Sequence, residues 1–305
     1  MKSTLILLLF IFSPIAMSCG EIKQNSEKEN TEDLTTSLTA LDHKGVLINH
    51  KIYGEGQPYT LLFVHGWCIN QSYWSSQVEE LSSEYKIVTI DLPGFGESGT
   101  NRENWSIEEY GTDINIVIEK LELTNVILIG HSMGGDIILE AALKNEEVLA
   151  LIGIDNFKEV GVEFTDEIKT EIAGFVNMLK ENFSEVAPAY AEGFLFHAST
   201  DSLVKTRVLK DFKNSDSTIA VSSLESLFEY AMLETKQLSK LKQKLYLINS
   251  DATPTNTDGL NSTGIAYEVA DIEATGHYPM IEKPKEFNRL LKETIRKIET
   301  LHNKK

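Results

Sequence analysis

Cysteine, proline and positive charge are scarce in this chain. Only 2 of its 305 residues are cysteine, Cys19 and Cys68, so a small disulfide-stapled scaffold is excluded. The 7 prolines and 19 glycines are too few for a collagen-like or low-complexity chain. Lys and Arg number 28 against 46 Asp and Glu, which gives a formal net charge of −18. A surface of that sign repels the phosphate backbone, so nucleic acid is not expected as a partner.

The remaining composition is that of an ordinary folded protein. Hydrophobic residues make up 42% of the chain, aromatic residues 9% and charged residues 24%, which excludes a wholly disordered chain. At roughly 100–200 residues per domain, this length allows one large domain with an insertion or two smaller domains. Either arrangement buries a sizeable core without disulfides.

The first 18 residues have the pattern of an export signal. One lysine precedes a continuous apolar run from Leu5 to Phe12, and Pro14 and small residues follow it. The run is shorter than the roughly 20 apolar residues of a membrane-spanning helix, and no other segment qualifies as one. Cys19 directly follows Ala16-Met17-Ser18, which resembles a bacterial lipoprotein signal whose cysteine is lipidated and becomes the mature N-terminus. Ordinary cleavage at the Ala-x-Ser site and an uncleaved anchor are the alternatives.

Residues 19–37 are interpreted as the lipidated cysteine followed by a flexible tether. Positions 20–37 contain five acidic residues, two lysines and almost no apolar side chains, too few to offset the entropy of ordering. We therefore expect an exported protein, attached by a lipid at Cys19 to a membrane of the cell envelope and facing the periplasm or the surface. Cys68 is then the one remaining cysteine, and no intramolecular disulfide is expected.

From about Leu38 the chain alternates strand-like and helical segments. Most of the strand-like segments are apolar throughout, which is typical of strands buried on both faces. The clearest helix, Ile107–Leu121, has apolar residues every three or four positions. This alternation predicts an α/β fold with a mostly parallel central sheet flanked by helices. The expected strands are Val46–Tyr53, Thr60–Val64, Lys86–Ile90, Val126–Ile129, Leu149–Ile154, Lys244–Asn249 and Ala266–Ile272.

The interval from about Asn156 to Gln243 breaks this alternation. It contains no strong strand pattern but several helical stretches, such as Glu167–Leu179 and Leu224–Leu233. We interpret residues 157–243 as a helical cap over the edge of the sheet. The core then consists of residues 38–156 and 244–305.

Gly130-His131-Ser132-Met133-Gly134-Gly135 lies between an apolar strand and an apolar helix. The glycines two residues before and two after Ser132 let strand and helix approach closely, so that the serine hydroxyl projects above the sheet in a nucleophile elbow. On this motif and its context the chain is identified as a member of the α/β-hydrolase superfamily. The resemblance extends from about Leu38 to Leu301.

Two further segments resemble functional motifs of the same superfamily. Leu61-Leu62-Phe63-Val64-His65-Gly66-Trp67 resembles its strand and oxyanion turn, which implies that the backbone N–H groups of Trp67 and Met133 hold an oxyanion. Thr275-Gly276-His277-Tyr278-Pro279 resembles its histidine loop, which implies that His277 takes the proton of Ser132. Asp91-Leu92-Pro93-Gly94-Phe95-Gly96-Glu97-Ser98 resembles a third motif, in which Asp91 is structural.

The acidic member of the expected triad departs from the family pattern. The superfamily usually places an acid before the proline that follows the penultimate strand, but Asn249-Ser250-Asp251-Ala252-Thr253-Pro254 has Thr253 there. Asp155 ends the preceding strand, where some α/β-hydrolases place the acid, and it is the preferred candidate. Asp251 is the alternative, and a weakened dyad without an acid is the third option.

The resemblance implies a serine hydrolase that acts on a small-molecule carboxylic ester, thioester or amide. The candidate pocket residues are Phe194, Phe196 and His197 of the cap, with Cys68 beside the oxyanion turn. Aminopeptidases and carbon–carbon bond hydrolases of the superfamily are the enzymatic alternatives. A non-catalytic binding lipoprotein is the alternative of another class. The sequence contains no metal-ligand cluster, phosphate loop or cofactor motif, so neither a metal nor a cofactor is expected.

Overall fold

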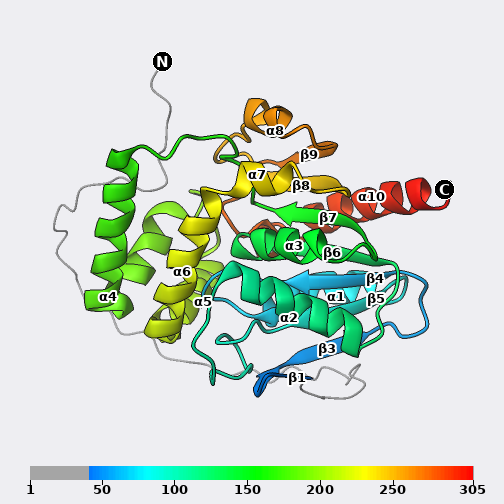
Figure 1. Ribbon diagram of the computed structural model, residues 1–305, viewed down its shortest axis with the longest axis horizontal. Coiled ribbons are helices and arrows are strands. Elements are labelled where there is room, and N and C mark those ends of the chain that lie inside the picture. The colour runs from blue at the N-terminus through cyan, green and yellow to red at the C-terminus, as the bar shows by residue number, and fades with distance from the viewer. Residues whose placement is uncertain (1–40, 305) are drawn as a thin grey trace.

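The computed structural model describes residues 41–304 (Figure 1). The predicted signal segment 1–18, Cys19, the tether and the expected start of the core at Leu38 lie outside the described residues. None of the helices in the described range is long and apolar enough to cross a membrane.

A seven-stranded sheet forms the centre of the molecule, in the order β3-β5-β4-β6-β7-β8-β9. β3 runs antiparallel to β5, and every other neighbouring pair is parallel. The predicted mostly parallel sheet is therefore confirmed. β1 and β2 form a separate two-stranded sheet. The strands are β1 Leu41–His43, β2 Val46–Ile48, β3 His50–Tyr53, β4 Thr60–Val64, β5 Lys86–Ile90, β6 Val126–His131, β7 Val148–Ile154, β8 Lys244–Ser250 and β9 Tyr267–Ile272.

The predicted strand Val46–Tyr53 is in fact two strands, β2 and β3, which belong to different sheets. Asn49 separates them. Its backbone N–H donates to Ser98 Oγ (2.8 Å), and its side chain donates to Asp91 Oδ2 (2.8 Å). The prediction of one strand was wrong because these bonds hold Asn49 to the 91–98 turn, and the residue pattern alone does not reveal them.

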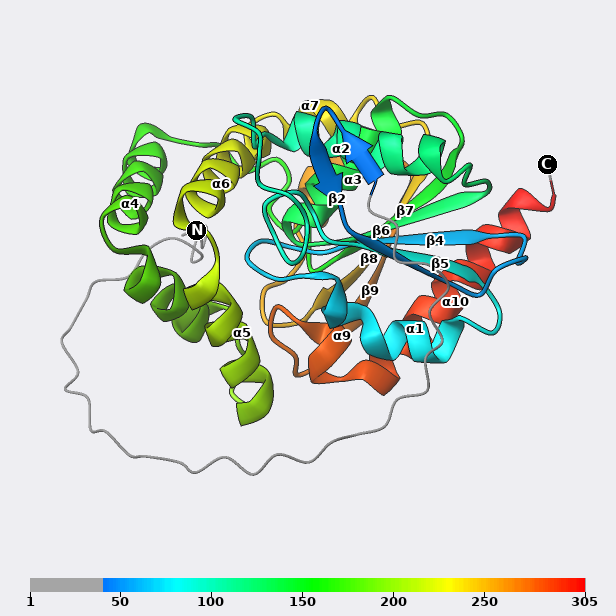
Figure 2. The same cartoon turned by 90° about the horizontal axis from the view of Figure 1, so that it is seen from below.

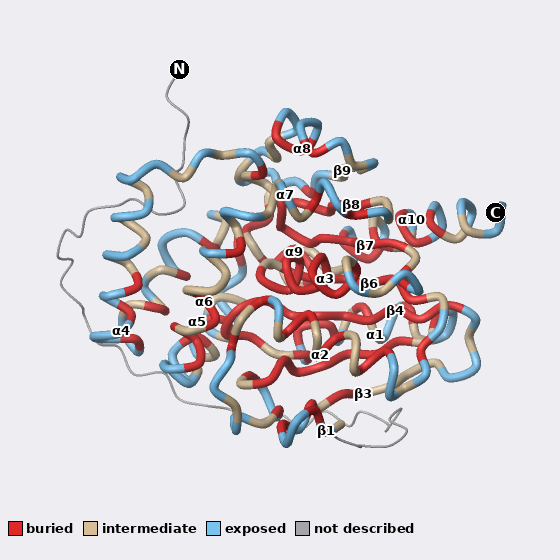
Figure 3. The backbone as a smooth tube through the Cα atoms, viewed as in Figure 1, coloured by how far each residue is buried: buried red, intermediate tan, exposed pale blue. Residues whose placement is uncertain are grey.

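Helices cover both faces of the central sheet (Figure 2). α2 (Ile107–Lys120) and α3 (Met133–Leu143) lie on one face, and α1 (Ser75–Leu81) and α10 (Pro284–His302) lie on the other. Every residue of β4 and of β6 is buried between them (Figure 3). The core therefore has the apolar strands that the sequence predicts. The short helices of the remaining loops are η1 Gln71–Trp74, α8 Thr257–Thr263 and α9 Pro279–Glu282.

Four helices lie between β7 and β8 in the sequence, and we call residues 157–243 the cap segment. They are α4 Asp166–Phe194, α5 Ser202–Asn214, α6 Ser217–Ala231 and α7 Glu234–Leu238. α4, α5 and α6 stand beyond the carboxyl ends of the parallel strands (Figure 1), and α7 packs on α3. α4 is kinked at Asn182, whose φ of −150° and ψ of 65° are not helical. The cap segment thus faces the sheet edge at which open α/β sheets bind ligands.

Candidate active site

Ser132 lies in a sharp turn between β6 and α3. Its φ of 51° and ψ of −126° fall outside the regions that residues with a side chain commonly adopt. The flanking glycines make this turn feasible. A Cβ on Gly130 would lie 2.2 Å from the Gly134 carbonyl oxygen, and a Cβ on Gly134 would lie 2.6 Å from the Val64 carbonyl oxygen. The turn therefore holds Ser132 at the carboxyl end of β6, on the side of the cap segment.

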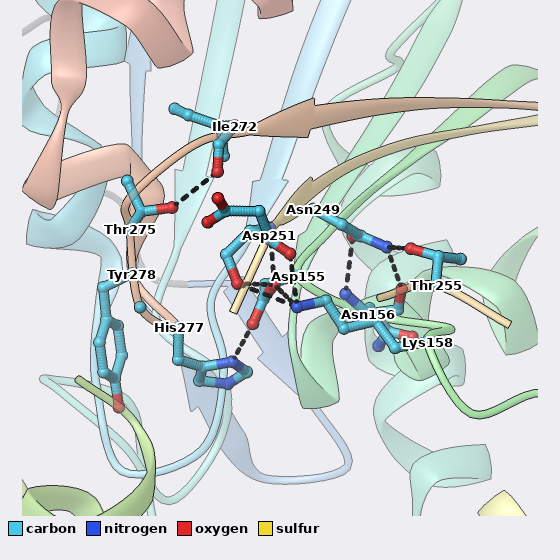
Figure 4. Close-up of polar contacts among 12 residues, drawn as sticks. Asp155, Asn156, Lys158, Asn249, Asp251, Thr255, Ile272, Thr275, His277 and Tyr278 are labelled. Carbon is cyan, nitrogen blue, oxygen red and sulfur yellow. Dashed lines mark hydrogen bonds and ion pairs between the residues drawn. The ribbon is translucent and has the colours of Figure 1, made fainter. Parts of the chain in front are cut away.

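His277 and Asp155 form a direct hydrogen bond, with His277 Nδ1 2.6 Å from Asp155 Oδ2 (Figure 4). His277 belongs to the loop between β9 and α9, whereas Asp155 follows the last residue of β7. The register of β6 and β7 pairs His131 with Ile154, so Ser132 and Asp155 leave the sheet side by side. Because a carboxylate only accepts, Nδ1 carries the ring proton and Nε2 is left to accept another.

The Asp155 carboxylate receives three further contacts in its buried position. Oδ1 accepts from the Ser250 backbone N–H and from Ser250 Oγ, each at 2.9 Å, and pairs with Lys158 Nζ at 2.5 Å. Burial raises the pKa of Asp155, but the His277 hydrogen bond and the Lys158 ammonium outweigh it and hold the pKa well below its usual value. Asp155 is therefore ionised at neutral pH.

Asp251, the other candidate acid, does not join this cluster. Its side chain is exposed and accepts from the Ala274 backbone N–H at 2.9 Å. Figure 4 shows the carboxylate of Asp155, not that of Asp251, bonded to the His277 ring. Within residues 41–304, neither Asp251 nor Thr253 is hydrogen-bonded to His277. Of the two candidates the structure brings Asp155 to the histidine.

Two hydrogen bonds fix the backbone of His277. Its N–H donates to the Leu195 carbonyl of the cap segment (2.8 Å), and its carbonyl accepts from His131 Nε2 (2.7 Å). Burial, and in second place the neighbouring His277, lower the pKa of His131 to about 3. His131 is therefore neutral, and its Nε2 carries the proton that the carbonyl requires. The residue preceding Ser132 thus positions the histidine loop.

Glu282 holds the same loop from the other side. Its carboxylate accepts from the backbone N–H groups of Gly276 (2.9 Å) and Tyr278 (3.0 Å), which flank His277. Thr200 Oγ1 of the cap segment donates to the same carboxylate (2.5 Å). A Cβ on Gly276 would lie 2.5 Å from the Leu195 carbonyl oxygen, so only glycine permits this close contact of loop and cap.

The backbone N–H groups of Trp67 and Met133 have no acceptor within residues 41–304. His65 explains the direction in which the Trp67 N–H points. His65 Nε2 accepts from the Leu92 N–H (2.9 Å), so Nδ1 carries the proton and donates to the Gly66 carbonyl (2.7 Å). Because a trans peptide points its C=O and the following N–H in opposite directions, this bond turns the Trp67 N–H away from His65.

A cavity of about 230 Å³ contains Ser132, Met133, Asp155 and His277 in its lining. Phe194 and Phe196 also line it, as expected from the sequence. Cys68 and His197 do not belong to its lining. Cys68 is buried, which raises the pKa of its thiol far above the usual value, and His197 Nδ1 lies 2.7 Å from Ser199 Oγ outside the cavity. The expectation that these two line the pocket is therefore corrected.

Sequence reasoning missed the residues that hold the site together. They include Lys158, Ser250, Glu282 and Asn156, whose Nδ2 donates to the Ser132 carbonyl and to Asp136 Oδ2 (3.1 Å). The one available signal was the place of Asn156, Lys158 and Ser250 at or just beyond the carboxyl ends of β7 and β8, where functional residues gather. Their individual bonds depend on loop conformation, which no local pattern encodes.

Comparisons with known proteins agree with this architecture. A sequence model of the alpha/beta hydrolase fold family matches residues 59–227. Epoxide hydrolase 4 of Homo sapiens is 30% identical over 186 residues, which cover 60% of this chain and 49% of that protein. Non-heme chloroperoxidase CPO-A1 of Kitasatospora aureofaciens is 33% identical over 92 residues, which cover 30% of this chain and 33% of that protein. The chain thus spans half or less of the length of these relatives.

The fold is also shared with solved structures. The esterase EaEST from Exiguobacterium antarcticum superposes with a TM-score of 0.72 at 22% identity, over 85% of this chain and 98% of that one. A likeness at this level of identity shows the common fold alone, and the chemistry has to be argued from the site.

Proposed function

Because the chain belongs to the alpha/beta hydrolase fold family, we propose that it is a serine hydrolase that cleaves a small or medium carboxylic ester through an acyl-enzyme. The observation that carries the proposal is the 2.6 Å contact between His277 Nδ1 and Asp155 Oδ2, with Ser132 on the same cavity. A serine hydroxyl is a weak nucleophile without an adjacent base, and an oriented imidazole is such a base.

Acylation begins when Ser132 Oγ attacks the ester carbonyl carbon and its proton passes to His277 Nε2. Asp155 stabilises the resulting imidazolium through its bond to Nδ1–H. The N–H groups of Trp67 and Met133 bind the oxyanion, and one donor of this kind lowers the barrier by about 3–4 kcal/mol. The intermediate then collapses, the C–O bond to the leaving group breaks, and His277 donates its proton to the departing alcohol.

Deacylation repeats these steps with water as the nucleophile. His277 removes a proton from water as the water oxygen attacks the acyl carbon, and the same two N–H groups bind the second oxyanion. Collapse releases the carboxylic acid, and the proton on His277 returns to Ser132 Oγ. The residues regain their starting states, and the net reaction is ester plus water to acid plus alcohol.

The elbow residue weighs against two other chemistries of the superfamily. Members that open epoxides or cleave carbon–halogen bonds use an aspartate nucleophile, and this chain has Ser132 at that position. We therefore do not transfer the name of the relative Epoxide hydrolase 4 to this protein.

The enzymatic alternatives and the non-catalytic alternative make different demands on the site. Thioester, amide and carbon–carbon bond cleavage, and aminopeptidase activity, use the same three residue types, so substrate panels must separate them. A non-catalytic binding lipoprotein is motivated by Thr253 in the usual place of the acid. The Asp155–His277 contact weighs against this alternative, because a carboxylate orients the histidine after all.

A fluorophosphonate probe tests the proposal before any substrate is known, because it labels only an activated serine. We expect mass spectrometry of the labelled protein to find the modification on Ser132, with no labelling in Ser132→Ala. The same protein is then assayed on para-nitrophenyl esters of increasing acyl length. A folded protein that neither reacts with the probe nor hydrolyses any ester contradicts the proposal.

We also propose that the protein is exported and attached to the cell envelope by a lipid at Cys19. Metabolic labelling with an alkyne fatty acid is expected to mark the wild type but not Cys19→Ala. Cys68→Ala is the matched control and should retain the label. Equal labelling of wild type and Cys19→Ala contradicts lipidation at this residue.

A further inference from the structure

Three acidic side chains outside the proposed triad line the cavity that holds Ser132 and His277. Asp136 belongs to α3, Glu159 to the loop after β7, and Glu234 to the first turn of α7. We call these three residues the acidic wall. They come from three separate elements and still face one cavity, so their meeting is a property of the fold and not of one acidic stretch of sequence.

Asp136 is the buried member of the acidic wall, with 4% of the residue exposed. Its Oδ2 accepts from Asn156 Nδ2 at 3.1 Å. No amide, ammonium or hydroxyl group in the part of the chain that the structure describes donates to its Oδ1, and the Glu234 carboxyl group lies beside Asp136. A buried carboxylate that lies against another carboxyl group is costly unless a proton or a cation lies between the two.

Burial raises the pKa of all three carboxyl groups of the acidic wall. Burial raises the pKa of Asp136 to about 6. Burial and the adjacent Asp136 carboxylate raise the pKa of Glu234 well above its usual value. The two carboxyl groups are also hydrogen-bonded to each other, which lowers the pKa of Asp136 and raises that of Glu234, so Asp136 loses its proton first. Burial also raises the pKa of Glu159, although the Lys158 ammonium counteracts it.

The protein's own cation at this cavity does not neutralise Asp136. Among the residues that line the cavity, all of them described, Lys158 is the single Lys or Arg. Its ammonium pairs with Asp155 Oδ1 (2.5 Å) and donates to the Ser250 carbonyl and to Ser250 Oγ (2.9 Å each). An ammonium has three N–H donors, and these three contacts occupy them.

We propose that the acidic wall binds an ammonium group of the substrate, so that the enzyme prefers cationic esters or amides to neutral ones. The inference rests on the proposed function, because it names the substrate class of the same site. No three His, Cys, Asp or Glu side chains of residues 41–304 are placed to hold a metal ion. The acidic wall therefore suits an organic cation, which needs fewer and less regular oxygen contacts.

The ammonium binds close to the reacting carbonyl in this arrangement. Asp136 follows Ser132 by four residues, about 6 Å along a helix axis. Asn156 Nδ2 donates both to the Ser132 carbonyl and to Asp136 Oδ2, so the two sites share one bridging amide. An ester whose ammonium lies a few bonds from its carbonyl is long enough to reach from Ser132 to Asp136. Phe194 and Phe196 supply apolar surface for the remaining part of the ester.

The test compares cationic substrates with neutral substrates of the same shape, using the full chain. Glycine para-nitrophenyl ester and para-nitrophenyl propionate differ by an ammonium on the acyl side. Acetylthiocholine and neohexyl thioacetate differ by a quaternary ammonium on the leaving group. The Ser132→Ala protein serves as the blank for spontaneous hydrolysis. We expect kcat/KM to be about tenfold or more higher for the cationic member of at least one pair.

Variants that replace a carboxyl group by an amide then locate the preference. Asp136→Asn and Glu234→Gln should each reduce the cationic-to-neutral ratio, and the double variant should bring it to about one. Glu229→Gln removes an exposed acid of α6 that does not line this cavity, and it should leave the ratio unchanged. The proposal is overturned if neither pair shows the preference, or if the preference survives the double variant. Ser132-dependent hydrolysis without preference leaves the proposed function standing.

A binding measurement tests the inference without requiring catalysis. The Ser132→Ala protein is titrated with glycine ethyl ester and with ethyl propionate, followed by NMR. Tighter binding of the glycine ester, lost on adding Asp136→Asn, supports the acidic wall even if no ester is turned over. Equal binding of the two esters overturns it. Circular dichroism checks folding, and Glu234→Gln replaces Asp136→Asn if the latter does not fold.

Discussion

His277 Nδ1 and Asp155 Oδ2 lie 2.6 Å apart although 122 residues separate them in the sequence. The pairing of β7 with β8 joins Ile154 to Ile248, which brings the two following loops together. Ser250, the last residue of β8, donates its N–H and its Oγ–H to Asp155. The end of β8 therefore supports the carboxylate, whereas the loop after β7 supplies it.

Replacing Asp155 by asparagine is expected to lower kcat by about 10³–10⁴-fold with little change in KM, because a neutral amide neither stabilises the imidazolium nor holds the correct tautomer. Asp251→Asn is the matched control and should stay within about threefold of the wild type, since Asp251 is exposed and bonded to Ala274. Steady-state hydrolysis of para-nitrophenyl acetate measures both. Equal losses, or a larger loss in Asp251→Asn, would remove Asp155 from its role.

Glu282→Ala should slow the reaction through the position of His277. The substitution leaves the N–H groups of Gly276 and Tyr278 without their acceptor, and a lost bond to a charged group costs about 1.5–3 kcal/mol. We expect kcat to fall by about ten- to a hundredfold while KM changes little, and Glu282→Gln to recover part of the loss. Glu286→Ala, an exposed acid of α10, should behave as the wild type. A change in KM alone would argue against positioning.

The sequence predicted the sheet and the elbow because both depend on short-range patterns. β4 and β6 are apolar runs buried along their whole length. Gly130 and Gly134 lie where the backbone segments around Ser132 come closest to each other. The division of Val46–Tyr53 into two strands was missed because Asn49 bonds to a turn about 45 residues later in the chain. The patterns that predict strands and turns lie within short stretches of sequence, whereas the hydrogen-bond partners of Asn49 lie far from it in the chain.

The same distinction between local patterns and distant partners holds for the residues of the candidate site. Ser132 and His277 could be found from motifs, and Asp155 from its place at a strand end. Three contacts could not be found, because each joins segments that only the folded chain brings together: Lys158 with Ser250, Asn156 with Ser132, and Glu282 with Thr200. The acidic wall is a further case, since its three residues have no common spacing in the sequence.

The same substitution, glycine to alanine, should have opposite effects on stability at two positions of the chain. Gly130→Ala places a Cβ 2.2 Å from the Gly134 carbonyl oxygen, which should destabilise the protein by several kcal/mol and abolish labelling of Ser132. Gly174→Ala lies within α4, where a Cβ meets nothing within 4 Å. It should stabilise the protein by about 0.5–1 kcal/mol through helix propensity. Urea unfolding compares the two, and tolerance of Gly130→Ala would contradict the close contact.

Asp136 gives folding a pH dependence of opposite sign to that of Asp155. Its pKa rises on folding from 3.8 to about 6, so the folded state binds the proton more tightly than the unfolded state does. This group therefore costs nothing below about pH 4, and stability falls as the pH rises through about 6. The pKa of Asp155 is lowered instead, so its contribution is present above its usual pKa and is lost as the pH falls.

Asp136→Asn removes the titrating group, and its stability relative to the wild type should grow with pH. We expect a difference near zero at about pH 4 that reaches on the order of 2–3 kcal/mol at about pH 8. Urea unfolding across this range measures it, and Glu229→Gln on the exposed side of α6 should show a small difference that does not vary with pH. If the difference for Asp136→Asn is equally constant, then Asp136 titrates alike in the folded and unfolded chains. In that case burial does not raise the pKa of Asp136, which contradicts the expected pH dependence.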